Sequence, residues 1–202
     1  MPGLKHERLC LPPVAGVDEA GRGPLAGPVV AAAVVLPAKG VPRGIDDSKK
    51  LSAIARAALF ARITDCAIVG IGVIEPQEID TLNIHWATMK AMTLAVDQVT
   101  ALIGHVPGHV LVDGNRLPRW DYASTALVGG DALSVSIAAA SIVAKHTRDA
   151  IMIRHHESYP HYGWASNKGY GSAAHLRGLR EFGPSPLHRR SFSPVAQAVL
   201  AL

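Results

Sequence analysis

Residues 16–28 read Gly-Val-Asp-Glu-Ala-Gly-Arg-Gly-Pro-Leu-Ala-Gly-Pro, and this stretch decides the fold. An apolar run at 14–17 leads into the two carboxylates, and a second apolar run at 29–36 follows the Gly- and Pro-rich segment. Two apolar runs punctuated in this way predict a strand, a tight loop and a second strand. We therefore expect Asp18 and Glu19 at the end of the first strand, directly before a turn.

The adjacent carboxylates Asp18 and Glu19 have two explanations. Successive side chains on a strand point to opposite faces, so the pair can share a metal ion only if the strand ends or bends there. Gly21 and Gly23 permit such a bend. The alternative is an ordinary glycine hairpin with solvated charges. The rest of the chain has to distinguish the two.

Composition bounds the class of protein. The 202 residues are 49% hydrophobic and 18% charged, enough for a full core in one domain, which excludes disordered and fibrous classes. The net charge of +4 favours an anionic partner only weakly, because 20 basic residues face 16 acidic ones. Cys10 and Cys66 are too few and too distant for a zinc motif. We expect a cytoplasmic protein with free thiols, without a signal peptide or membrane span.

The remaining pattern alternates strands and helices. Strands are predicted at 65–74, 109–115 and 123–128, and helices at 83–104 with Asn83 as N-cap, at 134–157 and near 172–181. This order predicts an α/β fold with a mixed sheet flanked by helices.

Two more carboxylates, Asp113 and Asp131, follow apolar strands. Each alone is more typical of a turn. Together with Asp18 and Glu19, however, they could converge as a site of hard oxygen ligands, which favours Mg²⁺ or Mn²⁺ over zinc. A pair of such ions is suited to hydrolysing a phosphodiester.

Seven motifs then follow one another along the chain: Gly16–Pro28, Asp47-Ser48-Lys49-Lys50-Leu51-Ser52, Val112-Asp113-Gly114, Gly130-Asp131, Ala138-Ala139-Ala140-Ser141-Ile142-Val143-Ala144-Lys145, Lys168-Gly169-Tyr170-Gly171 and His188-Arg189-Arg190-Ser191-Phe192. In residues, order and spacing they resemble the type 2 ribonuclease H (ribonuclease HII) family, from about Val14 to Phe192.

The resemblance implies a single ribonuclease H-like catalytic domain over 1–202, with about 165–202 as a small C-terminal helical extension. It also implies an endoribonuclease that uses two Mn²⁺ or Mg²⁺ ions. The catalytic and metal-binding carboxylates would be Asp18, Glu19, Asp113 and Asp131.

The same resemblance implies how the substrate is recognised. The turn of Gly21, Arg22 and Gly23 would present backbone groups to a 2′-hydroxyl, and Tyr170 would stack on the sugar of the adjacent deoxynucleotide. The implied partners are RNA/DNA hybrids and DNA containing ribonucleotides, cut 5′ to the ribonucleotide to leave 3′-hydroxyl and 5′-phosphate ends. Ribonucleotide removal from DNA would be the role. We expect a monomer, because no segment resembles a dedicated interface.

Basic residues leave several questions open. Lys49 and Lys50 lie in a loop-to-helix segment where a helix N-terminus and an ammonium group could hold a phosphate, and the family pattern favours Lys49 for that role over a solvated position. His188, Arg189 and Arg190 could contact phosphate or dock the C-terminal segment. The family usually has a lysine just before the aspartate at 131, where this chain has Gly130.

Two alternative functions remain. One is a nuclease of the same fold without junction specificity, which the presence of Gly21–Gly23 and Tyr170 argues against. The other is a catalytically silent hybrid-binding protein. The four carboxylates argue against it, because without metal they would repel the phosphate backbone and one another.

Overall fold

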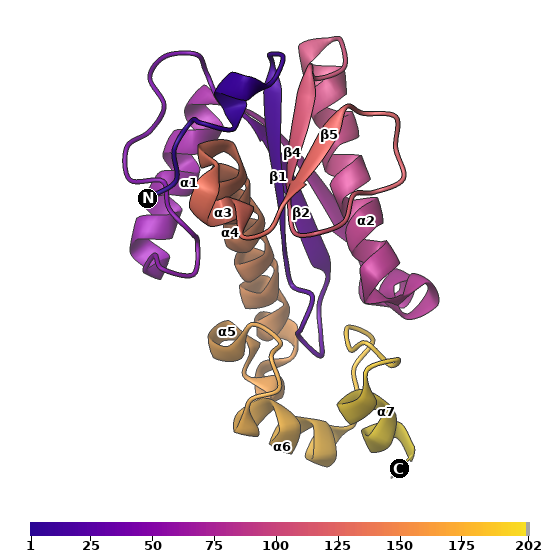
Figure 1. Cartoon of the computed structure of the whole chain (residues 1–202). Helices are drawn as coiled ribbons and strands as arrows, with labels where there is room; N and C mark the ends of the chain where they lie inside the picture. The colour runs from indigo at the N-terminus through magenta and orange to yellow at the C-terminus, as the bar shows by residue number, and fades with distance from the viewer. Residues whose placement is uncertain (201–202) are drawn as a thin grey trace.

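The fold is built on one five-stranded sheet (Figure 1), and the computed structural model describes residues 1–200. Its strands are β1 (Val14–Ala20), β2 (Val29–Val35), β3 (Ile68–Ile74), β4 (His109–Asp113) and β5 (Ser124–Leu127), in the spatial order β3-β2-β1-β4-β5. β1, β2 and β3 pair antiparallel, whereas β4 and β5 run parallel to β1. The predicted mixed sheet is confirmed.

Helices cover both faces of this sheet (Figure 1). α2 (Pro76–Ile103) packs on one face, and α1 (Ala53–Cys66) and α4 (Val135–Ser158) pack on the other. Glycine allows the close approach: a Cβ atom at Gly72 would lie 2.0 Å from the carbonyl oxygen of Ala91 on α2, and one at Gly16 would lie 2.1 Å from the backbone of Ser136 on α4. The small residues of β1 and β3 thus bring both helical layers onto the sheet.

A group of short helices lies beyond the end of the sheet at which the β1–β2 loop emerges (Figure 1). It comprises η2 (Pro160–Tyr162), α5 (Trp164–Asn167), α6 (Ala173–Phe182) and α7 (Ser193–Leu200). The buried side chains of Tyr162, Trp164 and Met152 pack there against Ala26 of the β1–β2 loop. The C-terminal helical extension is therefore fastened to that loop by its own aromatic core. Two other short helices, η1 (Glu7–Leu9) and α3 (Gly130–Leu133), lie elsewhere in the chain.

Two predicted boundaries were wrong. Asp65 and Cys66 were assigned to the third strand but form the end of α1, an Ala-rich helix that begins after the N-cap Ser52. α2 begins at Pro76, seven residues before Asn83. Asn83 interrupts α2 with a φ of 64° and still caps its second part, because its Oδ1 accepts hydrogen bonds from the backbone of His85 and Trp86.

The two other helices predicted from the sequence, at 134–157 and 172–181, are confirmed as α4 and α6, with Ser134 and Ser172 as N-caps. Among the described residues, no helix has both the length and the apolar character needed to cross a membrane.

Candidate active site

The parallel pairing of β1 with β4 brings Asp18 and Asp113 into neighbouring positions. Val17 pairs with Val112, so the two aspartates come next along their strands. β1 stays paired with β2 through both carboxylates and ends at Ala20, directly before the Gly-Arg-Gly turn, so the predicted position of Asp18 and Glu19 at the end of the strand is confirmed. The side chains of Asp18 and Glu19 consequently leave on opposite faces of the strand.

Asp113 links the two faces. Its charge raises the pKa of Asp18 and also that of Glu19, so it lies close to both. A 180 Å³ pocket beside α2 is lined by Glu19 and Asp113 together. Asp113, on β4, thus lies near both acidic groups of the continuous strand β1.

Asp131 joins this group from α3, not from a strand end as predicted, since β5 ends at Leu127. The backbone N–H of Gly130 donates a 2.7 Å hydrogen bond to Asp113 Oδ1. The N-terminal turn of α3 therefore holds Asp131 next to Asp113 and leaves only 9% of the Asp131 residue exposed.

The electrostatics of the carboxylates show an excess of negative charge. Burial raises the pKa of Asp18 well above its usual value, and the charges of Glu19 and Asp113 add to it. Burial also raises the pKa of Glu19, although Arg22, whose Nη1 is 3.2 Å from Glu19 Oε1, acts against it. The pKa of Asp131 is raised by burial and then by Asp113. Such a site is stabilised by a cation.

The donor set fits a hard divalent ion, because all four groups are carboxylates and offer oxygen ligands. They do not form a finished coordination sphere: among residues 1–200, no three Asp, Glu, His or Cys side chains converge closely enough to hold an ion.

A cleft of about 320 Å³ connects Asp18 and Glu19 with the Gly-Arg-Gly turn. It is lined by Asp18, Glu19, Ala20, Gly21, Arg22, Gly23, Ser48, Lys49, Lys145 and Tyr170. Gly21 has a φ of 97°, which lets the chain leave β1 sharply. Tyr170 is 48% exposed and lines the same cleft. The structure thus gathers every substrate-binding residue predicted from the sequence at one place.

Lys49 lies close to the carboxylates. Burial alone would lower the pKa of Lys49, but Asp18, Asp131, Asp47 and Asp113 together raise it. The predicted helix N-terminus at this residue was wrong, because Lys49 lies in a turn in which its N–H donates to Asp47 Oδ1, and α1 begins only at Ala53. The ammonium group, not a helix end, is what Lys49 offers to an anion.

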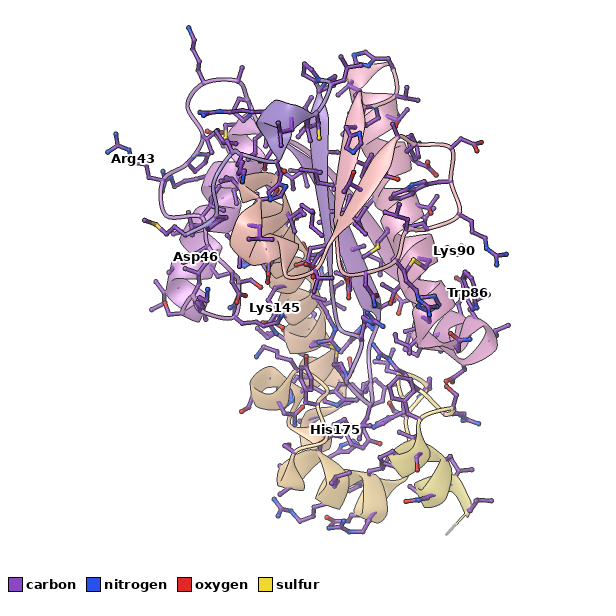
Figure 2. All side chains as sticks on the ribbon, viewed as in Figure 1. Arg43, Asp46, Trp86, Lys90, Lys145 and His175 are labelled. Carbon is purple, nitrogen blue, oxygen red and sulfur yellow. The ribbon has the colours of Figure 1, made fainter. Side chains whose placement is uncertain are left out.

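Sequence reasoning missed Ser48 and Lys145, which line the same cleft. The Ser141 hydroxyl of α4 donates a 2.7 Å hydrogen bond to Ser48 Oγ, which fixes the 47–50 turn. Lys145 projects from α4 (Figure 2), and its Nζ is 2.8 Å from Asp149 Oδ1. Both residues belong to motifs recognised in the sequence, at 47–52 and 138–145, and membership of these motifs could have identified them as candidate site residues.

Of the two roles considered for His188, Arg189 and Arg190, phosphate contact or docking of the C-terminal segment, the structure supports docking. Arg189 is fully buried and donates hydrogen bonds to the β1–β2 loop, and His188 is buried among Tyr162, Trp164 and His175. The backbone N–H of Arg190 donates to Asp80 on α2.

Comparison with known proteins shows the family of this chain. Residues 15–195 match the family model described as Ribonuclease HII. The chain belongs to the ribonuclease HII family. Relatives named Ribonuclease HII include one from Rhizorhabdus wittichii, 62% identical with 92% of this chain and 90% of the relative covered, and one from Erythrobacter litoralis, 57% identical with 93% and 90% covered. The protein is thus a hydrolase that acts as a ribonuclease H, which excludes the silent binder.

Solved structures of related proteins share the fold. Ribonuclease H2 from Pyrococcus horikoshii OT3 is 26% identical, covers 93% of this chain and 97% of its own, and superposes with a TM-score of 0.77. Bst-RNase HIII in complex with Mn²⁺ is 21% identical and covers 93% of this chain and 69% of its own, with a TM-score of 0.72. The ribonuclease H-like fold predicted from the sequence is confirmed.

Proposed function

We propose that this member of the ribonuclease HII family hydrolyses the RNA strand of RNA/DNA hybrids and also incises 5′ to single ribonucleotides in duplex DNA. The observation that supports this most directly is the single cleft that Asp18 and Glu19 share with Gly21–Gly23 and Tyr170. Groups able to hold a catalytic ion and groups able to read a sugar lie within one opening. The proposed role is ribonucleotide removal from DNA.

Asp18, Glu19, Asp113 and Asp131 would hold two Mg²⁺ or Mn²⁺ ions. When bound, such ions activate the attacking water and neutralise the leaving oxygen. The donor chemistry supports this, as does the manganese complex described for Bst-RNase HIII. The chain's own contribution is positioning: the N–H of Gly130 orients Asp113, and Lys49 places a cation beside Asp18 and Asp131 where a substrate phosphate would approach.

Recognition of the ribonucleotide would use backbone groups of Arg22 and Gly23. A 2′-hydroxyl both donates and accepts hydrogen bonds and is the local difference between RNA and DNA, so peptide groups can read it without reading the base. Tyr170, opposite Gly23, would stack on the neighbouring deoxyribose. Together the turn and the ring would select an RNA-to-DNA junction.

The test is cleavage of a labelled DNA duplex that contains one ribonucleotide, with an all-DNA duplex and a continuous RNA/DNA hybrid as controls, in Mg²⁺, Mn²⁺ and EDTA. We expect metal-dependent incision 5′ to the ribonucleotide, a 3′-hydroxyl and a 5′-phosphate. Asp113→Asn should reduce the rate about 10²- to 10³-fold, as loss of a main electrostatic group does. Cleavage of the continuous hybrid alone would support the nuclease without junction specificity.

A further inference from the structure

Two arginines, Arg148 on α4 and Arg189 in the C-terminal extension, are buried in a way that the reaction itself does not explain. They are 1% and 0% exposed. Neither makes an ion pair with a carboxylate within residues 1–200. Burying a charge without an opposite charge is costly unless it is fully hydrogen-bonded. Their partners are backbone carbonyls of the β1–β2 loop and, for Arg148, also the carbonyl of Lys168.

Arg189 holds the Gly-Arg-Gly turn directly. Its Nη2 donates to the carbonyl of Gly21 at 2.6 Å and its Nη1 to that of Arg22 at 2.9 Å. Nε donates to Gly27 at 2.9 Å and Nη2 also to Pro28 at 3.1 Å. One guanidinium therefore ties the first half of the loop to its second half.

Arg148 connects the same loop to the segment that carries Tyr170. Its Nε and Nη2 donate to the carbonyls of Pro28 and Ala26, at 3.0 and 3.1 Å, and its Nη1 donates to that of Lys168 at 2.9 Å. Lys168 is two residues before Tyr170. The fork of Arg148 thus joins the loop to the segment of Tyr170, beside the 2.8 Å backbone hydrogen bond from the Leu25 N–H to the Gly169 carbonyl.

The orientation of the peptide groups follows from these contacts. In a trans peptide the C=O and the next N–H point in opposite directions. Because the carbonyls of Gly21 and Arg22 point to Arg189, the N–H groups of Arg22 and Gly23 point away from it, and both residues line the cleft. Arg189 therefore sets which way the sugar-reading donors face.

We propose that Arg148 and Arg189 are positioning residues for junction recognition: they form a two-sided clamp that fixes the N–H donors of Arg22 and Gly23 at a set distance from Tyr170. This inference rests on the proposed function and deepens it. The clamp contacts none of the four carboxylates, so it acts on substrate selection and not on the hydrolytic step. A continuous hybrid offers a 2′-hydroxyl at every position and can bind in several registers, whereas a lone ribonucleotide offers one register only.

The test uses Arg189→Lys and Arg148→Lys in the full chain. Lysine keeps the charge, but its single ammonium cannot reproduce the planar fork. The readout is the ratio of kcat/KM on the single-ribonucleotide duplex to kcat/KM on the continuous hybrid. We expect this ratio to fall about tenfold in each variant, because displacements near 1 Å can cost up to about a hundredfold.

Tyr162→Phe and Asp80→Asn are the matched controls. The Tyr162 hydroxyl donates to the carbonyl of Gly183 inside the extension, and Asp80 holds the Arg190–Ser191 backbone on α2; neither contacts the β1–β2 loop through these bonds. Both controls loosen the extension and should leave the ratio unchanged. All proteins are assayed well below the lowest melting temperature of the set.

The outcomes separate the two proposals. A lower ratio in the arginine variants, with controls at the wild-type ratio, supports the clamp. Equal losses on both substrates, or a ratio that falls equally in the controls, would overturn it and leave a structural role only. If the wild-type enzyme does not incise the single-ribonucleotide duplex, the proposed junction specificity fails and the clamp's role fails with it. If the wild type incises it and the arginine variants keep its ratio, only the clamp is refuted.

Discussion

Gly23 lies against the ring of Tyr170: a Cβ atom added to Gly23 would lie 3.6 Å from Tyr170 Cε1, an ordinary contact. Gly21, two residues earlier, differs completely. Its Cβ would lie 2.0 Å from Arg148 Nε and 2.8 Å from the carbonyl oxygen of Pro28, and its φ is +97°. The first glycine is therefore required by the fold, whereas the second leaves a space beside Tyr170.

The Gly23→Ala variant should fold normally but cleave its substrate more slowly. We expect its free energy of unfolding to stay within about 0.5 kcal/mol of the wild type, while incision at a single ribonucleotide falls about tenfold because the methyl group narrows the gap in front of Tyr170. Gly21→Ala should lose about 2 kcal/mol or more, from its left-handed φ and the clash. Melting temperatures and initial rates check both. Wild-type cleavage by Gly23→Ala would contradict a sugar-binding role for this gap.

Gly130→Ala tests how Asp113 is oriented. A Cβ atom at Gly130 would lie 2.6 Å from Ile137 Cδ1, 3.2 Å from Leu127 Cβ and 3.3 Å from Asp113 Oδ1. The end of the Ile137 side chain can turn away, but the close contacts with Leu127 and Asp113 should displace the Asp113 carboxylate by a few tenths of an ångström. We expect kcat on the continuous hybrid to fall about tenfold. The control is Gly129→Asn, because nothing lies within 4 Å of that Cβ and asparagine tolerates the φ of +65°. Equal kcat in all three proteins would show that Asp113 does not depend on Gly130.

Lys49→Gln should weaken substrate binding more than Lys50→Gln does. Lys49 lies beside Asp18 and Asp131, whereas the side chain of Lys50 is 59% exposed and pairs with Asp46 at 3.8 Å. A single phosphate contact changes the slope of log K against log salt by about one. We therefore expect Lys49→Gln to reduce that slope by about one and Lys50→Gln to leave it unchanged, measured as KM for the hybrid from low to high salt. Identical salt slopes in the two variants would mean that Lys49, like Lys50, is a solvated turn residue without a phosphate contact.

The sheet was predictable because its strands are apolar runs bounded by Gly and Pro, a local signal. α1 was not, because its Ala-rich sequence between Ser52 and Cys66 lacks a strong apolar stripe and its core contacts are few, mainly Leu59 and Ile63. The end of β1 was predicted correctly, because the Gly-Arg-Gly turn that follows Ala20 is itself a local signal.

Most of the candidate site could be predicted from sequence motifs. The features that the motifs did not predict depend on contacts between residues far apart in the chain. Asp131 was predicted correctly as a candidate but placed at a strand end, since nothing local distinguishes a short strand followed by α3 from a longer strand. The contact of Arg189 with Gly21 joins residues 168 positions apart. Composition and periodicity carry no information on which of two adjacent arginines is buried, and only the packed extension decides that Arg189 turns inward.

Asp18→Asn should stabilise the metal-free protein at neutral pH while abolishing cleavage. The folded state raises the pKa of Asp18, so between its ordinary value of 3.8 and its folded value the folded chain binds more protons than the unfolded chain. Stability then falls as pH rises through that window. Asparagine carries no charge, so it removes the free-energy cost of ionising a buried carboxyl group. Its Oδ1 can still accept the 2.6 Å hydrogen bond from the Glu19 N–H.

Melting temperatures of Asp18→Asn and the wild type in EDTA, measured from below pH 4 to pH 7, check the sign of this change in stability. At this chain length about 1 kcal/mol corresponds to roughly 2–4 °C, and we expect an increase of that order at pH 7 that shrinks toward the acidic end, where both states of the wild type carry the proton. The exposed Asp121→Asn is the control and should show no such trend. Adding Mn²⁺ should raise the melting temperature of the wild type more than that of Asp18→Asn, because an ion that binds only the folded state stabilises it. A variant less stable than the wild type at pH 7 in EDTA would mean that burial and the neighbouring carboxylates do not destabilise the charged form of Asp18 in the folded protein.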